Sequence, residues 1–374
     1  MTSPAGQRPA RVAHLSTVHH EWDNRILNKE CRALAEGGFD THLVISAHHD
    51  RVVRGVQVHA IPQRSRRTRL ARSQIEAWRQ LRRLNPDLLH IHDPELIPLA
   101  LLWGRVHSRP VVYDAHEDLV KQLATKPYLR GRLRRLATPV ARALLGLADR
   151  GCAAIVTATE SIGDTFDQTD RPVLTVRNLP WAADFVVADV ATNPPVAVYT
   201  GDISEERGLS RMIAAIEAVG GQVPDLTLRM AGRTLVDDDR LRDHPRIDYC
   251  GLVPPTELPG VIGGARVGLI FLERLPNYEN SLPTKVFEYM ASGVPFLATD
   301  FPAWRDLFGD ADAGVFVDTD DPAAVAAALG ELISDPQRCA ELGRNGRRAI
   351  EERFGFEAEA AKLVGVVDSL TAQR

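Results

Sequence analysis

Short apolar runs alternate with amphipathic segments along almost the whole chain, and this alternation constrains the fold more than any other feature. In the first half, the expected strands lie at residues 12–16, 41–46, 56–61, 88–92, 111–113, 154–159 and 173–177. Parallel strands joined by helices produce this pattern. The first half is therefore predicted to form a doubly wound α/β sheet.

A second series of the same kind follows, with expected strands at residues 196–200, 226–230, 247–249, 267–272, 294–298 and 314–317. Residues 179–195 break the periodicity and end in two prolines. A chain of 374 residues is also too long for one ordinary core. We predict a Rossmann-like domain at 1–178, a linker at 179–195, a second Rossmann-like domain at 196–354, and a terminal helix at 355–374 that crosses back to the first domain.

The segment 281–300 contains a predicted helix that has the features of a phosphate site. Pro283 suits the first turn of a helix, and Gly293 and Pro295 end it, so the helix is expected at 284–291. A helix N-terminus with Lys285 beside it attracts phosphate, and Glu288 can accept hydrogen bonds from ribose hydroxyls. The alternative is an ordinary capped helix with a solvated Lys285–Glu288 pair. The segment alone leaves both interpretations open.

A second segment of the same domain has related features. After the strand at 196–200, Gly201 allows close approach to the backbone, and Arg207 precedes a predicted helix at 209–219. This arrangement is a plausible diphosphate clamp. It matches neither common nucleotide-binding glycine motif, so it gains weight only because Lys285 and Glu288 lie in the same domain.

In the first domain, polar residues follow the expected strands at their carboxyl ends, where doubly wound sheets bind ligands. The loop at 17–25 carries His19, His20, Asp23 and Arg25 before the helix predicted at 26–36. Capping of that helix by Asp23 or Asn24 would explain one residue of this group but not the others. We interpret the loop as part of a functional site.

Two other strand ends in this domain carry polar residues. Asp93 followed by Pro94 is explained by helix capping alone. His116 lies between carboxylates after the strand at 111–113, where an imidazole could orient a hydroxyl or donate to a sugar. An ordinary loop histidine is the competing interpretation.

Composition excludes several classes of protein. The net charge of −4 gives no general attraction to nucleic acid, and four scattered cysteines without a paired motif are expected to be reduced thiols. No apolar run is long enough to cross a bilayer, and the first ten residues lack the apolar segment of a signal peptide, so we expect a cytoplasmic protein. Arginine-dense segments at 64–84 and 130–147 indicate either peripheral contact with an anionic membrane or a solvated helix face.

Several segments resemble the retaining GT-B glycosyltransferases of family 4. In the second half these are the pattern G201-x5-R207-G208 and the block LPTKVFEYMASGVP, which is the most specific of them. In the first half, DNRILNKECRALAEGGFDTHLV, HIHDPELIPLALL and VVYDAHE are similar to what family members carry at these places. The resemblance covers nearly the whole chain.

The resemblance implies a nucleoside-diphosphate sugar bound by the second domain, an acceptor bound by the first, and closure of the cleft between them, without a cofactor or metal. Arg207 and Lys285 would hold the diphosphate, Glu288 the ribose, and His116 the transferred sugar. The resemblance also assigns a donor-binding set, which comprises Gly201, Asn280, Ser281, Leu282, Pro283 and Thr284.

The chain also departs from the family pattern. Asn280 replaces the first of two glutamates, Asp202 stands where an arginine is frequent, and Arg207 replaces the usual loop lysine. The loop with His19, which replaces a glycine-rich turn, is expected to recognise the acceptor. We expect a polysaccharide, lipid-linked or other cell-envelope acceptor. The alternatives are a small natural-product acceptor, a sugar-nucleotide 2-epimerase, and a non-catalytic homologue that binds nucleotide or membrane.

Overall fold

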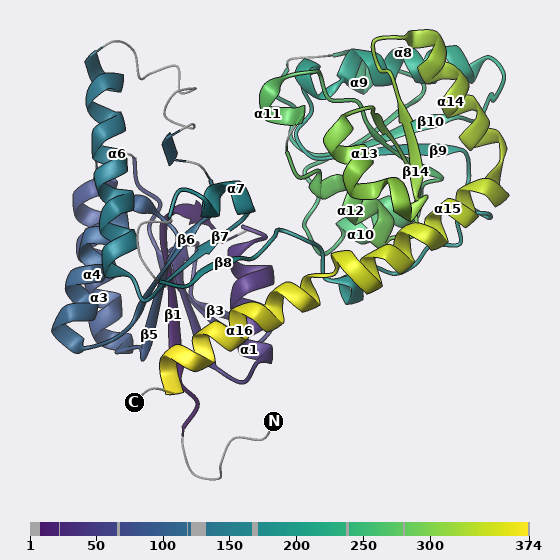
Figure 1. Cartoon of the computed structure of the whole chain (residues 1–374). Helices are drawn as coiled ribbons and strands as arrows, with labels where there is room; N and C mark the ends of the chain where they lie inside the picture. Colours follow the sequence, from purple (N-terminus) through teal and green to yellow (C-terminus); the bar gives the residue numbers. More distant parts are fainter. Residues whose placement is uncertain are drawn as a thin grey trace. The chain divides into compact units, whose positions relative to one another are not determined.

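The computed structural model describes residues 8–21, 23–65, 68–117, 119–120, 132–166, 171–236, 239–279 and 281–372. It contains two compact units (Figure 1). The first unit comprises Met1–Asn178 and Glu357–Arg374, and the second comprises Leu179–Phe356. Each unit has its own sheet, which is mostly parallel in the first unit and fully parallel in the second, so the prediction of two doubly wound α/β domains is confirmed.

The first unit is built on an eight-stranded sheet with the order β3-β4-β2-β1-β5-β6-β7-β8. Its strands are β1 (Arg11–His20), β2 (Asp40–Ser46), β3 (Arg51–Val53), β4 (Val56–Ile61), β5 (Leu88–Ile91), β6 (Val111–Ala115), β7 (Ala154–Thr157) and β8 (Val173–Thr175). All seven predicted strands are present. The short edge strand β3 was not predicted, and it pairs antiparallel with β4 as a hairpin, unlike the other pairs.

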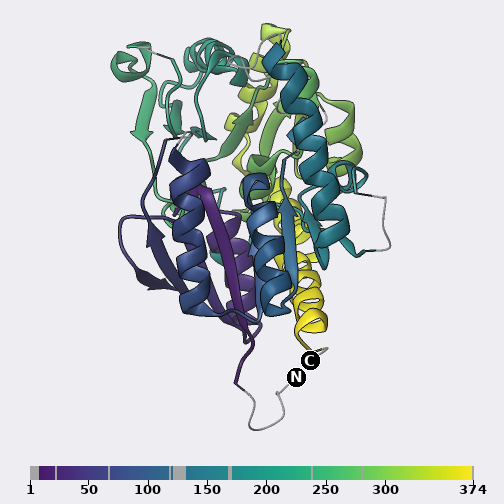
Figure 2. The same cartoon turned by 90° about the vertical axis from the view of Figure 1, so that its left-hand side faces the viewer.

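Helices cover both faces of this sheet. On one face lie α3 (Gln74–Leu84), α4 (Ile97–His107) and α6 (Arg132–Gly151), which Figure 2 shows from the front. The other face carries the π-helical segment η1 (Ile26–Cys31), α1 (Arg32–Glu36) and the terminal helix α16 (Phe356–Ala372). Shorter elements are η2 (Arg69–Ser73), η3 (Pro94–Leu96) and α7 (Glu160–Gly163).

Helix α16 returns to the first unit, as predicted. Its Glu359 is almost completely buried and forms an ion pair with Arg177, at 2.9 Å between Oε1 and Nη2. Leu363 and Val367 are also buried. A Cβ atom on Gly37 would lie 2.9 Å from Val364, so glycine at position 37 permits the close approach of α16.

The second unit has a six-stranded, all-parallel sheet with the order β11-β10-β9-β12-β13-β14. Its strands are β9 (Val196–Thr200), β10 (Thr227–Ala231), β11 (Ile247–Gly251), β12 (Val267–Ile270), β13 (Phe296–Thr299) and β14 (Gly314–Val317). All six were predicted. The 3-10 turns and helices of this unit are η4 (Ala182–Asp184), η5 (Glu205–Arg207), α8 (Leu209–Gly220), α9 (Arg240–Asp243), α10 (Leu258–Gly263), α11 (Pro276–Glu279), α12 (Thr284–Ala291), α13 (Pro302–Phe308), η6 (Gly309–Ala311), α14 (Pro322–Ser334), α15 (Pro336–Ala349) and the π-helical η7 (Ile350–Phe354).

The strand orders place one switch point in each sheet. The chain runs outward from β1 through β2 and then returns to β5 on the other side of β1. In the second unit, β10 and β11 lie on one side of β9, and β12 lies on the other. Ligands of doubly wound sheets bind where the strand order reverses, outside the carboxyl ends of the strands. The loops after β1, β5, β9 and β12 are therefore the places to examine.

Two sequence expectations concern the chain as a whole. The four cysteines, Cys31, Cys152, Cys250 and Cys339, are free thiols. Among the helices that the structure describes, none combines the length and apolarity that a bilayer span requires.

Candidate active site

The loop after β9 comes close to the start of α12, a helix far along the chain. Gly201 has a φ of +115°, in the region that glycine adopts without strain. A Cβ atom at this position would lie 2.7 Å from Nζ of Lys285. The absence of a side chain on Gly201 therefore gives Lys285 its place against the backbone at the end of β9.

Lys285 lies among aromatic and charged groups at this switch point. Its ammonium is 5.8 Å from the centre of the Tyr199 ring. Burial and the positive charge of Arg207 lower the pKa of Lys285, although Glu288 and Asp202 act in the opposite direction. Two cations thus share one small region, which an anionic ligand would stabilise.

Arg207 ends the short turn η5, directly before α8. Gly208 follows with a φ of +87° and forms the N-cap of α8. The Arg207 guanidinium lies 6.0 Å from the centre of the Tyr278 ring. Burial raises the pKa of Tyr199 to about 12, even though Arg207 favours its ionised form. Arg207, which precedes α8, and Lys285, in the first turn of α12, therefore both lie near Tyr199.

The start of α12 differs from an ordinary capped helix. The N-cap residue is Pro283, and among the described residues no side chain caps the helix. The Ser281 hydroxyl donates to the Tyr278 carbonyl at 2.8 Å, and the Trp304 indole donates to the Ser281 carbonyl at 2.9 Å. These bonds hold the residues before α12 in place, so its first amide groups are positioned by backbone structure rather than by a cap.

The remaining residues of the predicted donor set lie on or beside α12. Leu282 and Pro283 precede the helix, Thr284 is its first residue, and Glu288 lies one turn further along. The structure therefore gathers most of the predicted donor set at one switch point. Asn280 lies outside the described residues.

In the first unit, three of the predicted residues form one hydrogen-bonded chain. Nδ1 of His19 is 2.7 Å from Oδ2 of Asp23, and Nε2 of His19 is 3.1 Å from Nε2 of His116. Asp114 follows, with Oδ2 at 3.4 Å from Nδ1 of His116. The end of β1 and the residue after β6 thus present two adjacent imidazoles, a pair that can donate to or accept from hydroxyl groups.

The charged groups around these hydrogen-bonded side chains favour the protonated form of His19. Burial opposes protonation, but the hydrogen bond and charge of Asp23, together with Asp93 and Asp114, outweigh it and raise the pKa of His19. Burial likewise opposes ionisation of Asp23, yet His19 and the Ile26 amide lower the pKa of Asp23 to about 2. Asp23 therefore both caps the segment after it and orients His19.

Asp93 has a larger role than the capping that the sequence suggests. Asp93 is the N-cap residue of η3 and Pro94 follows it, as predicted, but the Asp93 side chain makes no capping bond. Instead, the carboxylate accepts from the Ser16 and Thr17 hydroxyls and from the Val18 amide, at 3.1–3.2 Å. Asp93 follows β5, the neighbour of β1, and it holds residues 16–18 near the end of β1. Strand β1 continues to His20, which pairs with Ser46 of β2, so it is longer than predicted.

Arg25 and His20 are placed differently from His19. The Arg25 guanidinium is buried, and it donates to Asp114 at 2.9 and 3.1 Å and to the Val176 carbonyl at 2.7 Å. This placement suits orientation of Asp114 and corrects the expectation that Arg25 contacts an acceptor. His20 is exposed and lies 3.3 Å from the Gln63 amide nitrogen, away from the His19–His116 pair.

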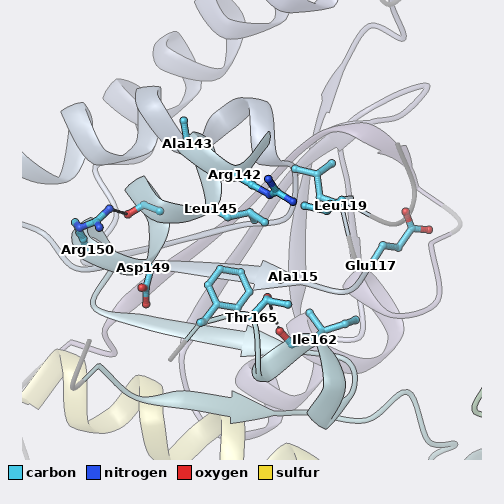
Figure 3. Close-up of a pocket in the computed structure, with 13 residues that line it drawn as sticks. Ala115, Glu117, Leu119, Arg142, Ala143, Leu145, Asp149, Arg150, Ile162 and Thr165 are labelled. Carbon is cyan, nitrogen blue, oxygen red and sulfur yellow. Dashed lines mark hydrogen bonds between the residues drawn. The ribbon is translucent and has the colours of Figure 1, made fainter. Parts of the chain in front are cut away.

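A cavity of about 650 Å³ opens beside His116 and was not predicted. Figure 3 shows residues of β6, α6 and α7 around it. Most of its lining is apolar, with Arg142 and Glu117 among the charged members. No sequence motif marks this cavity, because its walls come from segments that are separated along the chain.

Two groups of described residues have the ligand types of a metal site. In the first, a donor atom from each of His14, Glu30, His90 and His92 lies within 4.8 Å of the others. The second comprises His92, Asp114 and His116. Neither group was predicted from the sequence.

Family models match both halves of the chain. The family model described as "Glycosyltransferase Family 4" matches residues 24–176, and the model described as "Glycosyl transferases group 1" matches residues 194–335. Each model therefore covers one of the two wound regions.

Curated relatives include transferases of several substrates. A phosphatidyl-myo-inositol mannosyltransferase of Mycolicibacterium smegmatis is 24% identical over 307 residues, covering 76% of this chain and 72% of that protein. A glycogen synthase of Mycobacterium tuberculosis is 23% identical, covering 75% and 68%. A 2-deoxystreptamine N-acetyl-D-glucosaminyltransferase of Streptomyces fradiae is 26% identical, covering 71% and 69%.

Solved structures share the fold. Sucrose-phosphate synthase from Thermosynechococcus elongatus has a TM-score of 0.72 at 17% identity and covers 98% of this chain and all of that one. Anabaena HepE in complex with UDP and glucose has a TM-score of 0.66 at 14% identity, covering 96% and 100%. The fold, the site and the family models together define the class: the protein is a glycosyltransferase with the GT-B fold. Within that class, the chain belongs with the family 4-like glycosyltransferases.

Proposed function

We propose that the protein transfers a sugar from a nucleoside-diphosphate sugar to a cell-envelope acceptor with retention of the anomeric configuration. The second unit binds the donor, and the first unit binds the acceptor. The observation that carries this proposal is the placement of Lys285 against Gly201, with Arg207 at the N-terminal end of α8. Two cations and two helix N-termini at one switch point suit a diphosphate.

The chemistry follows from the charge that develops during transfer. When the bond between the sugar and the diphosphate breaks, negative charge grows on the leaving phosphate and positive charge grows on the anomeric carbon. Lys285, Arg207 and the start of α12 stabilise the negative charge. The acceptor hydroxyl attacks from the face that the diphosphate leaves, and a phosphate oxygen takes its proton. Glu288 binds the ribose hydroxyls, and His116 contacts the transferred sugar.

The acceptor binds to the first unit in this proposal. His19 and His116 offer polar contacts, and the neighbouring cavity offers an apolar wall. A partly apolar glycosyl acceptor matches both features. The mannosyltransferase relative is named for phosphatidyl-myo-inositol, which supports a lipid-linked acceptor. The Streptomyces fradiae relative is named for a small aminocyclitol, which keeps a natural-product acceptor as the second candidate.

Peripheral membrane contact is part of this proposal. Four large apolar side chains on α4 and α6 are exposed, and these are Leu102, Val106, Val140 and Leu147. Basic residues of the same helices are Arg105, Arg142 and Arg150. Apolar and basic side chains on adjacent helices favour binding to anionic lipid. Sedimentation with anionic vesicles, compared with neutral vesicles, tests this contact.

Binding of nucleotides tests the donor site directly. A thermal-shift panel of UDP, GDP, ADP and their sugars should raise the melting temperature with one base, because ligand that binds only the folded state stabilises it. Arg207→Ala and Lys285→Ala should each abolish that shift. No shift with any nucleotide would contradict the donor site and favour a non-catalytic homologue.

Product analysis then distinguishes a glycosyltransferase from a sugar-nucleotide 2-epimerase. With the donor identified, transfer requires an added acceptor, whereas a 2-epimerase would turn over the sugar nucleotide alone. The anomeric configuration of the product, measured by NMR, tests retention. An inverted product would overturn the proposed mechanism but not the donor site.

A further inference from the structure

The sheet of the first unit has an unusual polar cluster on one face. One face of the sheet is covered by α3, α4 and α6, and there the strands β1, β5 and β6 present apolar residues. These are Ala13, Leu15, Leu89, Ile91 and Tyr113. On the opposite face, the same strands present His14, His90 and Asp114, all fully buried. Parallel strands that are buried on both faces are normally apolar on both. This face is therefore an exception that needs a physical explanation.

The cluster is closed by η1, which brings Glu30 over the histidines. The Glu30 amide donates to the Arg25 carbonyl, five residues earlier, as in a π-helical turn. Such turns are frequent at functional sites. Glu30 is fully buried, and its Oε2 lies 3.8 Å from Nε2 of His90. The local distortion of the helix thus places a carboxylate within the histidine cluster.

Several donor atoms of this cluster have no hydrogen-bond partner among the described residues. They are Nε2 of His14, Oε2 of Glu30 and both ring nitrogens of His90. Oε1 of Glu30 does have an ion pair with Arg25 at 2.9 Å. Buried polar atoms in folded proteins normally have partners, so this concentration indicates a missing occupant.

The position of the proton on His92 limits what could bind within the histidine cluster. Nδ1 of His92 is 3.1 Å from Oδ2 of Asp114, so it carries the proton. Neutral His92 then has a lone pair on Nε2, which lies 2.9 Å from Nδ1 of His14. Two ring nitrogens at this distance need either a proton between them or a cation in front of both.

The net charge of the buried cluster leads to the same two options, a bound proton or a bound cation. Glu30 and Asp114 are buried carboxylates, and Arg25 is the buried cation that pairs with both, at 2.9 Å each. The pair of acids therefore carries one negative charge that Arg25 does not neutralise. Either Glu30 binds a proton or the cluster binds a cation.

We propose that His14, Glu30, His90 and His92 hold a divalent transition-metal ion of the zinc class. Three imidazoles and one carboxylate are ligands that zinc accepts in a four-coordinate shell. With ligands at about 2.0–2.1 Å, such a shell spaces its donor atoms about 3.3 Å apart. The ligand atoms would be Nδ1 of His14, Nε2 of His92, Nε2 of His90 and Oε2 of Glu30, so Nε2 of His14 would stay outside the shell. The distance of 2.9 Å from Nδ1 of His14 to Nε2 of His92 and that of 3.8 Å from Nε2 of His90 to Oε2 of Glu30 lie on either side of the expected value. Asp114 orients His92 from behind, as outer carboxylates do in zinc sites.

The ion would be structural. All four ligands are fully buried, so the site has no open position for a substrate. The metal would join β1 and β5 to η1, at both ends of the loop that carries His19 and Asp23. It would thereby fix the position of that loop. The prediction that sugar transfer itself needs no metal is separate and stays a prediction.

Metal content tests the proposal without an activity assay. The full chain is produced with zinc in the medium, purified without a metal-affinity step and analysed by plasma mass spectrometry. We expect about one zinc per chain. Glu30→Gln and His90→Asn should lower this at least tenfold. His59→Asn is the matched control, because His42 and His59 form another stacked pair with nitrogens 2.9 Å apart.

Cobalt spectroscopy on the unaltered chain makes the test independent of whether the variants fold. After refolding with Co²⁺, a four-coordinate site should show visible absorption that zinc abolishes. Less than a tenth of an equivalent of metal in the unaltered chain, or no cobalt band, would overturn the proposal and leave a protonated Glu30 as the explanation. Equal metal content in Glu30→Gln, His90→Asn and the unaltered chain would also overturn it. Loss of nucleotide binding would affect only the proposed function.

Discussion

At the scale of single residues, the two units use charge differently. In the second unit, Lys285 and Arg207 place positive charge near each other, and burial adds to the cost. In the first unit, His19, Asp23 and His116 form a hydrogen-bonded chain in which acid and base stabilise each other. The first arrangement suits the binding of an anion, and the second suits hydrogen bonding to hydroxyl groups.

Replacing Lys285 with alanine should lower the rate of sugar transfer by about 10²–10³-fold, the loss typical when a group that stabilises transition-state charge is removed. The measurement is kcat with the identified donor and acceptor. Lys362→Ala, which alters an exposed lysine on α16, is the control and should retain the rate of the unaltered enzyme. A Lys285→Ala variant with more than a third of normal activity would refute the role.

Asp23→Asn should lower the free energy of unfolding by about 2 kcal/mol near pH 6, because the shift of the Asp23 pKa from 3.8 to about 2 corresponds to that amount. A depressed carboxyl pKa stabilises above pH 3.8, and this contribution disappears as the pH falls through 2. The raised pKa of His19 stabilises below 6.5, and its contribution disappears as the pH rises through the folded value.

The cost of Asp23→Asn should therefore be smaller at pH 9 than at pH 6. Denaturant unfolding at the two pH values measures this difference. His20→Asn, in the same loop but exposed, should cost less than about 0.5 kcal/mol at both. A cost of Asp23→Asn that does not change with pH would contradict the assigned ion pair.

At the scale of elements, the β9–α8 connection depends on close backbone approach. Gly208 has a φ of +87°, and a Cβ atom there would lie 2.7 Å from Cβ of Phe271 and would overlap its carbonyl group. Phe271 directly follows β12. The turn before α8 thus packs against the end of the neighbouring strand, and this contact brings Arg207 toward the switch point.

Gly208→Ala should destabilise the second unit by about 1–3 kcal/mol, because alanine is strained at positive φ and also meets Phe271. Gly365→Ala is a control with the opposite expected sign. Gly365 lies within α16, and a Cβ atom there meets nothing within 4 Å, so the substitution should stabilise by about 0.5–1 kcal/mol. Calorimetric melting of both variants tests the pair, and equal melting temperatures would contradict the argument.

At the scale of the whole molecule, the chain leaves the first unit after Asn178 and returns to it at Glu357. The return depends on α16, whose Leu363 and Val367 are fully buried. The Arg177–Glu359 ion pair joins the last residues before the second unit to the first turn of α16. Both crossings between the units are thus anchored at the same place on the first unit.

Arg177→Ala should loosen α16 from the first unit, because it leaves the buried carboxylate of Glu359 with fewer partners. We expect amide exchange in α16 to become about tenfold to hundredfold faster, equivalent to about 1.4–2.8 kcal/mol. Arg344→Ala, at an exposed position of α15, is the control. Unchanged exchange in α16 would show that apolar packing alone holds the helix.

The sequence by itself determined the wound α/β architecture, because alternating apolar runs and amphipathic segments have few other solutions. It also predicted Lys285, Arg207 and Glu288 as donor-site residues from local signals, namely helix starts and glycines, and that role stays a prediction. The bounds of α12 and β4 agree with prediction for the same reason. These features depend on residues that are neighbours in the chain.

Tertiary structure decided what depends on neighbours in space. The sequence predicts that Asp93 caps a helix, but the strand order also places its carboxylate beside the end of β1. Arg25 reads as a loop cation, but it is buried against Asp114. The group of His14, Glu30, His90 and His92 arises only when β1, β5 and η1 meet. Each of these contacts joins residues that are separated in the chain, and side-chain direction across a sheet cannot be read from spacing alone.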